Sequence, residues 1–148
     1  MFDRVGFADK INEFMLLNGY TATTLAETIS VSPSTIYNLL QNRYKQPDTE
    51  VFFKLIEFFG YSADYMLGFV EFPAETHYYP PLRKYGDKLR RLLKQKGETQ
   101  KTFIENMKIS SSLAYKWLSN ETLPSVDYLV KIANYFEITV DTLIERIK

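Results

Sequence analysis

The sequence lacks the residues on which most metal and covalent chemistry depends: none of its 148 residues is cysteine, and only one, His77, is histidine. Without thiols there is no disulfide framework, no thiolate nucleophile and no zinc–thiolate site. His77 has no neighbouring ligand residue, so we expect no metal. The sequence also has no glycine-rich phosphate loop after a strand and no nucleophile with a plausible base. We therefore expect neither an enzyme nor a cofactor.

Long apolar runs are missing as well. The apolar stretches are short and interrupted by charged residues, so no membrane-spanning segment is expected. The first residues, MFDRVGFADK, lack the basic segment followed by an apolar block that marks a secretory signal. We expect a globular protein of the cytoplasm, with no membrane partner and no evident small-molecule substrate.

Formal charge is balanced over the whole chain but not along it. Residues 1–70 carry five Lys and Arg against eight Asp and Glu, a net charge of −3, whereas residues 71–148 carry thirteen against ten, a net charge of +3. Eight of the basic residues lie between Arg83 and Lys101. This local density favours a polyanion as the partner of the second half. A solvated helix face would show the same composition.

The chain contains an internal duplication. A shift of 78 residues aligns the two halves, and after the loop NRYKQP the shift becomes 77. A single insertion in a polar loop is what two homologous folded units show. The positions matched at the shift of 78 include Gly19 and Gly97, Thr21 and Thr99, Ser32 and Ser110, Tyr37 and Tyr115, and Asn42 and Asn120.

Each half is predicted to form five short helices, because its apolar residues recur at intervals of three and four between Gly, Ser, Thr, Asn and Pro. The expected N-caps are Thr21, Ser32 and Ser62, and their counterparts Thr99, Ser110 and Thr139. The fold class is therefore all-α, with two tandem five-helix domains over 1–70 and 84–148. The segment 71–83, rich in proline and aromatic residues, is the expected linker.

The apolar stripes of these helices are the expected cores. In the first half they are Phe7, Ile11, Phe14, Met15, Leu25, Ala26, Ile29, Ile36, Leu39, Leu40, Val51, Leu55, Ile56 and Phe59. In the second half they are Tyr85, Leu89, Leu92, Leu93, Phe103, Ile104, Met107, Ala114, Trp117, Leu118, Tyr128, Ile132, Ala133 and Phe136. The only tryptophan is thus expected in a core and not in a ligand site.

Two helices joined by a tight turn, the second opening on hydroxyl residues and showing a polar face, form the layout of a helix-turn-helix. Both halves resemble the lambda-repressor/Cro-type helix-turn-helix family, also called the xenobiotic-response-element family. The second half is the more similar, through ETQKTFIENMKISSSLAYKWLSNETLPSVDYLVKIANYFEITVDTLI. The resemblance covers nearly the whole chain outside the linker and tips, and implies two lambda-repressor-like DNA-binding domains. At the helix exit, where the family usually has Gly, both halves have Asn.

In that family the start of the third helix reaches base edges, and the start of the second helix and the loop after the third hold phosphates. The resemblance implies recognition helices over 32–42 and 110–120. In the second domain it implies a cap and base contacts from Ser110, Ser111, Ser112, Leu113, Tyr115 and Lys116. The phosphate contacts it implies there are Gln100, Lys101 and Asn120.

In the first domain the corresponding pattern is weaker. Ala22 stands where similar proteins use a Gln to hold the DNA backbone, and the surrounding domain is acidic. The corresponding cap and base-contacting residues are Ser32, Pro33, Ser34, Thr35, Tyr37 and Asn38. The expected phosphate contacts are Gln41, Asn42, Arg43 and Lys45.

Several interpretations of function stay open at this point. The first is sequence-specific double-stranded DNA binding by a repressor-like transcription regulator whose tandem units approach neighbouring half-sites. The linker can extend to about 40 Å, and half-sites one turn apart are separated by about 34 Å. Alternatively, the acidic first domain pairs chains in a homodimer and only the second contacts DNA. The competing class is a protein-binding helix-turn-helix module, such as an antitoxin or an antagonist of a host factor.

Overall fold

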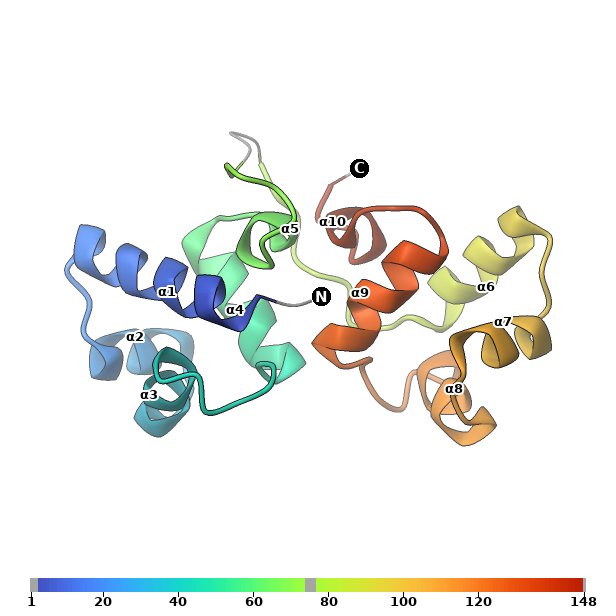
Figure 1. The fold of residues 1–148 in the computed structure, drawn as a ribbon, viewed down its shortest axis with the longest axis horizontal. Helices are drawn as coiled ribbons and strands as arrows, with labels where there is room; N and C mark the ends of the chain where they lie inside the picture. Colours follow the sequence, from blue (N-terminus) through green and yellow to red (C-terminus); the bar gives the residue numbers. More distant parts are fainter. Residues whose placement is uncertain (1–2, 74–76, 148) are drawn as a thin grey trace. The chain divides into compact units, whose positions relative to one another are not determined.

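The structure, a computed structural model, describes residues 3–73 and 77–147, and all regular secondary structure in those ranges is helical. The chain divides into two units, Met1–Tyr78 and Tyr79–Lys148, each with five helices in the same order (Figure 1). The all-α tandem fold is thus confirmed. Unit 1 contains α1 (Arg4–Asn18), α2 (Ala22–Ile29), α3 (Pro33–Leu40), α4 (Thr49–Phe59) and α5 (Ala63–Met66). Unit 2 contains α6 (Gly86–Lys96), α7 (Gln100–Met107), α8 (Ser111–Leu118), α9 (Val126–Tyr135) and α10 (Val140–Leu143).

Side-chain hydroxyls begin the helices at the positions that the sequence predicts. Thr21 and Thr99 cap α2 and α7, each accepting the N–H three residues on at 3.1 and 3.2 Å. Ser32 and Ser110 cap α3 and α8 in the same way, at 3.4 and 3.1 Å. Pro33 lies in the first turn of α3, where its missing N–H leaves no hydrogen bond unmade. The caps of Ser32 and Ser110 thus fix where α3 and α8 begin.

The predicted apolar stripes form the two cores. Trp117 is 1 % exposed, and its ring lies 5.1 Å from that of Tyr128, edge to face. In unit 1, Phe7 and Phe52 are fully buried with their rings 5.9 Å apart. A few predicted core residues at the edges of the stripes are only half-buried: Phe14, Leu40, Val51, Leu92, Ile104, Met107, Tyr128 and Phe136. The phase of every helix is nevertheless as expected.

The first helices of the two units differ in length and in how they begin. α1 has 15 residues and is capped by Asp3, whose Oδ1 accepts the Gly6 N–H at 2.9 Å. α6 has 11 residues and no side-chain cap from its own N-cap residue. Instead Gly86 packs against the end of α8, so closely that a Cβ there would lie 2.3 Å from the Leu118 carbonyl oxygen. Only glycine fits at this start.

Part of the expected linker belongs to unit 2. The Tyr79 N–H donates to the Arg146 carbonyl oxygen, and the Leu82 N–H donates to that of Ile144, both at 2.8 Å. Pro81 between them is buried. The segment from Tyr79 onward therefore belongs to unit 2, and the division between the units falls between Tyr78 and Tyr79, inside the expected linker 71–83. Residues 74–76 of that linker lie outside the described residues.

Candidate nucleic-acid interface

Unit 2 presents the polar face of α8 to solvent. Ser111, Ser112 and Lys116 are exposed, and Tyr115 is 58 % exposed. The opposite side of the helix carries the buried Trp117. Because the apolar stripe fixes the rotation of α8 about its axis, the four polar side chains form one outward ridge.

A cleft lies along each side of this ridge. One, of about 380 Å³, is lined by Gln100, Lys101, Ile104, Glu105, Ser111 and Tyr115. The other, of about 340 Å³, is lined by Arg90, Ser112, Tyr115, Lys116, Leu118, Ser119 and Glu121. The start of α7 thus borders one flank of the α8 ridge, and α6 borders the other. Six of the residues predicted to contact bases and phosphates in this unit line these two clefts: Gln100, Lys101, Ser111, Ser112, Tyr115 and Lys116.

Arg90 is the one basic residue of α6 that lines these clefts, and the sequence analysis did not include it among the candidates. Its guanidinium lies 3.7 Å from Asp87, and its side chain is 49 % exposed. No local sequence signal places Arg90 beside Lys116, because the two residues are 26 positions apart and lie on different helices. Their juxtaposition adds a second cation to the flank of the α8 ridge.

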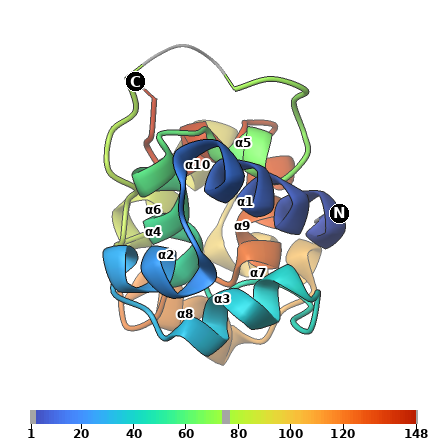
Figure 2. The same cartoon turned by 90° about the vertical axis from the view of Figure 1, so that its left-hand side faces the viewer.

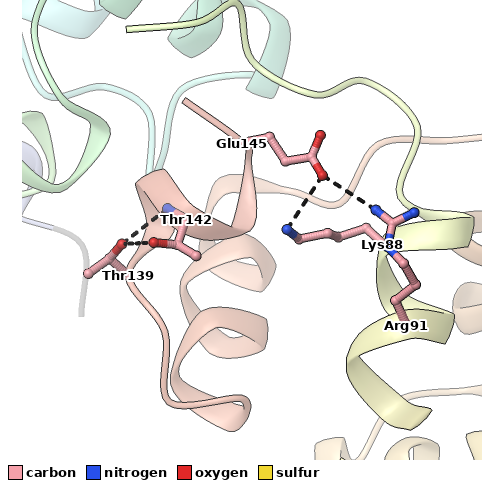
Figure 3. Close-up of polar contacts among 5 residues, drawn as sticks. All are labelled: Lys88, Arg91, Thr139, Thr142 and Glu145. Atoms are coloured by element: carbon pink, nitrogen blue, oxygen red, sulfur yellow. Dashed lines mark hydrogen bonds and ion pairs between the residues drawn. The ribbon is translucent and has the colours of Figure 1, made fainter. Parts of the chain in front are cut away.

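Two other basic residues of α6 are engaged within the unit. Glu145 Oε1 accepts from Lys88 Nζ at 3.5 Å and from Arg91 Nη2 at 3.4 Å (Figure 3). In the same view the predicted cap Thr139 accepts the Thr142 N–H at 3.1 Å. The Lys88 side chain is only 16 % exposed. The basic density around α6 therefore serves partly to hold the end of the chain.

Asn120 has a structural partner. Its Oδ1 accepts the Gly86 N–H at 2.9 Å, and its backbone is left-handed, with φ of 62°. A left-handed residue was expected at this exit. The side chain thus supplies the cap that α6 does not receive from Tyr85, although the residue itself is exposed.

Unit 1 carries hydroxyls at the start of α3. Ser32 Oγ lies 3.0 Å from Ser34 Oγ and 2.9 Å from Thr35 Oγ1, so the Ser32 hydroxyl is hydrogen-bonded to both. Tyr37 is 49 % exposed, less than its counterpart in unit 2. A cleft of about 330 Å³ beside α3 is lined by Thr35, Leu39, Tyr44, Gln46, Asp48 and Val51.

The loop after α3 folds back onto the helix in unit 1. Asn38 Nδ2 donates to the Tyr44 hydroxyl at 3.1 Å, and Arg43 Nη1 donates to Asn38 Oδ1 at 3.1 Å. Both ends of the Asn38 amide are therefore engaged. A bidentate contact between this amide and adenine requires the two hydrogen bonds to open first. The corresponding residue of unit 2, Lys116, has an exposed side chain that makes no hydrogen bond or ion pair with the described residues.

The start of the second helix also differs between the units. Gln100 is half-buried at the edge of a cleft, whereas Ala22 is 6 % exposed. Every predicted contact residue is exposed or half-buried, and none is buried. The exposed ones are Ser32, Pro33, Ser34, Tyr37, Gln41, Arg43, Lys45, Lys101, Ser110, Ser111, Ser112, Tyr115, Lys116 and Asn120. The half-buried ones are Thr35, Asn38, Asn42, Gln100 and Leu113.

A tight turn between the second and third helices, with a third helix that presents its polar start to solvent, occurs twice and defines a tandem helix-turn-helix protein. A family described as helix-turn-helix matches residues 11–66, and the Cro/C1-type HTH DNA-binding domain matches residues 88–148. The chain belongs to the lambda-repressor/Cro-type helix-turn-helix family, with two domains in tandem. Neither a curated protein nor a solved structure matches the chain.

Within 3–73 and 77–147 no helix is long and apolar enough to cross a membrane. The same ranges contain no group of three or more His, Cys, Asp or Glu residues able to hold a metal ion.

Proposed function

We propose that the chain is a sequence-specific double-stranded DNA-binding protein that regulates transcription in a repressor-like manner, with unit 2 as its principal DNA-contacting unit. The observation that carries this proposal is the α8 ridge. Ser111, Ser112, Tyr115 and Lys116 point outward together between two clefts. A ridge of this kind at the start of a recognition helix suits the major groove, where lysine donates to guanine acceptors.

The charge of unit 2 supports the same assignment. Its half of the chain carries a net charge of +3, and Lys101 at the start of α7 is exposed beside the ridge. The backbone N–H groups at the start of a helix, with the helix dipole, favour a phosphate there. In this arrangement Gln100 and Lys101 hold phosphates on one flank of the ridge. Arg90 reaches the DNA backbone on the other.

Unit 1 is less suited to the same task. Its half of the chain carries a net charge of −3, its Asn38 amide is engaged with Arg43 and Tyr44, and Ala22 is buried where unit 2 has Gln100. We assign unit 1 a supporting role, in which it brings a DNA-contacting unit 2 into a larger assembly. Direct contact of α3 with a second half-site is the alternative that the matched variants below separate.

The first experiment is a salt titration of binding to duplex fragments retained by the purified chain. Neutralising phosphates releases counterions, so log K falls with log salt with a slope of roughly −0.9 for each phosphate contacted. The two cations that we place on phosphates in unit 2, Lys101 and Arg90, predict a slope of roughly −1.8. A binding constant that does not change with salt, or no duplex binding, would refute the proposal.

Matched substitutions at positions 38 and 116 then test which unit reads sequence. These positions correspond under the shift of 78 residues. Lys116→Ala should relax the preference at one base pair, at a cost of about 1–3 kcal/mol for the preferred site, whereas Asn38→Ala should leave site selection unchanged. Gln100→Ala should weaken binding to all sequences alike. If Asn38→Ala changes site selection as much as Lys116→Ala does, both units read DNA.

A protein-binding module remains the second candidate function. The paired side chains of Asn38 on α3 and of Arg43 in the loop after it favour this function for unit 1, because they are already hydrogen-bonded without DNA. This candidate predicts retention of a protein partner, with no salt-dependent duplex binding by either unit.

A further inference from the structure

Unit 1 exposes apolar side chains that its fold does not require. Leu16 is 81 % exposed and Leu17 is 72 % exposed, both in the last turn of α1. The corresponding residues of α6 in unit 2 are Lys94 and Gln95, which are also exposed. Since the same bundle forms with polar residues at these positions, the two leucines serve something other than the fold.

Leu17 continues into a surface of aromatic rings. It lies three residues after Phe14 on α1, so the two side chains are neighbours on one helix face. The Phe14 ring lies 6.1 Å from that of Tyr20, 5.8 Å from that of Phe58 and 6.0 Å from that of Tyr61. All these rings are half-buried. We call the set the ring surface: Phe14, Leu17, Tyr20, Phe58, Tyr61 and Tyr65.

Unit 2 has a polar network at the same place. The counterparts of Tyr20 and Phe58 are Glu98 and Tyr135, and the Tyr135 hydroxyl donates to Glu98 and accepts from Asn106 Nδ2. Lys96 Nζ lies 4.6 Å from the centre of the Tyr135 ring. Two copies of one bundle thus differ at this face, which carries a network of polar groups in unit 2 and a cluster of aromatic rings in unit 1.

From this difference we infer that the ring surface of unit 1, with Leu16 beside it, is the face through which two copies of this chain pair. The inference rests on the proposed function, in which unit 2 contacts DNA and unit 1 joins chains. The pairing gives each assembly two copies of unit 2.

The shape of the surface favours a second copy as the occupant. It contains protruding side chains, Leu16 and Leu17, next to a floor of half-buried rings. A two-fold interface uses the same patch on both partners, so each patch must offer both a projection and a place to receive it. The ring surface together with Leu16 meets that condition, because the exposed leucines project and the half-buried rings beside them can receive the partner's leucines.

The size of the surface is also sufficient. Two almost fully exposed leucines and five half-buried rings present roughly 500 Å² on each copy, hence about 1,000 Å² for a pair, which is the lower bound for a specific interface. In Figure 1 and Figure 2, α5, which carries Tyr65, lies at the opposite end of unit 1 from α3. Within unit 1, a partner seated over α5 therefore leaves α3 uncovered.

The test is sedimentation velocity of the full chain at concentrations up to about 100 µM. The double variant L16K/L17Q takes the residues that unit 2 carries at these positions, and Phe72→Ser removes a 74 % exposed apolar side chain elsewhere in unit 1. We expect the parent chain to dimerise, L16K/L17Q to weaken the dimer by at least about tenfold, and Phe72→Ser to leave it unchanged. A monomeric parent chain, or equal effects of both variants, overturns the inference.

Cross-linking gives a second measurement that does not depend on destabilising the dimer. The chain has no cysteine, so Leu17→Cys introduces the only thiol, and Lys94→Cys places one at the corresponding face of unit 2. A short bifunctional maleimide should link Leu17→Cys chains in pairs and leave Lys94→Cys chains single. If Lys94→Cys chains are linked and Leu17→Cys chains stay single, the ring surface is not the pairing face. DNA binding by a chain that stays monomeric overturns this inference alone, whereas an intact dimer without DNA binding overturns the proposed function alone.

Discussion

Replacing Asn42 or Asn120 by glycine makes the same chemical change at corresponding positions, and the two variants should change stability in opposite directions. Both residues have left-handed backbone, with φ of 56° and 62°. A left-handed conformation costs a residue other than glycine roughly 1–2 kcal/mol, less for asparagine. Substitution by glycine removes this conformational cost, but it lowers the stability of the folded state by about 0.5–1 kcal/mol because glycine gives the unfolded chain more freedom. These two terms nearly cancel at both positions.

The difference in stability between the two variants therefore depends on the side-chain oxygens of the two asparagines. Asn42 Oδ1 is buried and accepts no hydrogen bond from the described residues. Asn120 Oδ1 accepts the N–H of the buried Gly86 at 2.9 Å. A buried polar group without a partner costs about 1–3 kcal/mol. Asn42→Gly removes such a group and should stabilise unit 1 by about 1 kcal/mol, whereas Asn120→Gly creates one at Gly86 and should destabilise unit 2 by about 1–3 kcal/mol.

The reason for this contrast lies in the first helices. The counterpart of Gly86 in unit 1 is Ala8, which lies inside α1 because that helix begins at Arg4. Its N–H is therefore engaged in the helix, and no free donor is left for Asn42 Oδ1. Because α1 begins earlier than α6, unit 1 has the asparagine but no N–H donor at the position that corresponds to Gly86.

The assay is urea unfolding followed by two signals. Trp117 is the only tryptophan and is buried in unit 2, so its fluorescence follows unit 2 alone, whereas far-ultraviolet circular dichroism follows both units. Asn120→Gly should lower the Trp117 midpoint. Asn42→Gly should leave that midpoint unchanged and raise the midpoint of the remaining dichroism. In thermal unfolding, a change of 1 kcal/mol corresponds to about 4–8 °C for a unit of this size. Equal shifts of the same sign in both variants would contradict the assignment of the two amides.

Two further predictions concern unit 2 and share the Trp117 signal. Gly86→Ala should destabilise unit 2 by about 1–3 kcal/mol or more, because the new Cβ would lie 2.3 Å from the Leu118 carbonyl oxygen; an unchanged urea midpoint would show that the chain relaxes there without strain. Burial, then the hydrogen bond to Glu98, raises the pKa of Tyr135 above its ordinary value of 10.0. The neutral hydroxyl thus stabilises the fold fully below that pH, and the stability is lost as pH rises through the higher folded pKa. The urea midpoint should therefore fall above about pH 10, less steeply in Tyr135→Phe, and equal slopes in both chains would exclude this hydroxyl as the cause.

Much of the fold could be predicted from sequence because it depends on short-range signals. A cap such as Thr21 or Ser32 acts within three residues of itself, and apolar spacing sets the face of each helix that packs inward. The duplication then gave two independent examples of each helix, so that a weak signal such as Thr139 could be compared with Ser62. The helix bounds of the two units follow the shifts of 78 and 77 residues, except at the start of the first helix and by one residue at the end of the fourth.

The chemistry around the candidate contact residues was much less predictable, because it depends on contacts between distant residues. The hydrogen bond between Asn120 and Gly86 joins residues that are 34 positions apart, and the contact between Glu145 and Lys88 joins residues that are 57 positions apart. Neither contact follows from periodicity or capping. The pairing of Asn38 with Arg43 is close in sequence, but it depends on the path of an irregular loop. Sequence patterns therefore identified which residues face outward, but not which of them are already engaged.

The two units have the same order of helices but differ at the positions that the proposed function assigns to DNA contact. Converting unit 1 into a second DNA-contacting unit would take more than one substitution. Ala22 is 6 % exposed where Gln100 is half-buried, so a glutamine at position 22 must first find room at the surface. The Asn38 amide must also break its hydrogen bonds with Arg43 and Tyr44 before it can contact a base. Ala22→Gln alone should therefore leave duplex affinity unchanged, and a gain comparable to the loss in Gln100→Ala would show that α3 of unit 1 already contacts DNA.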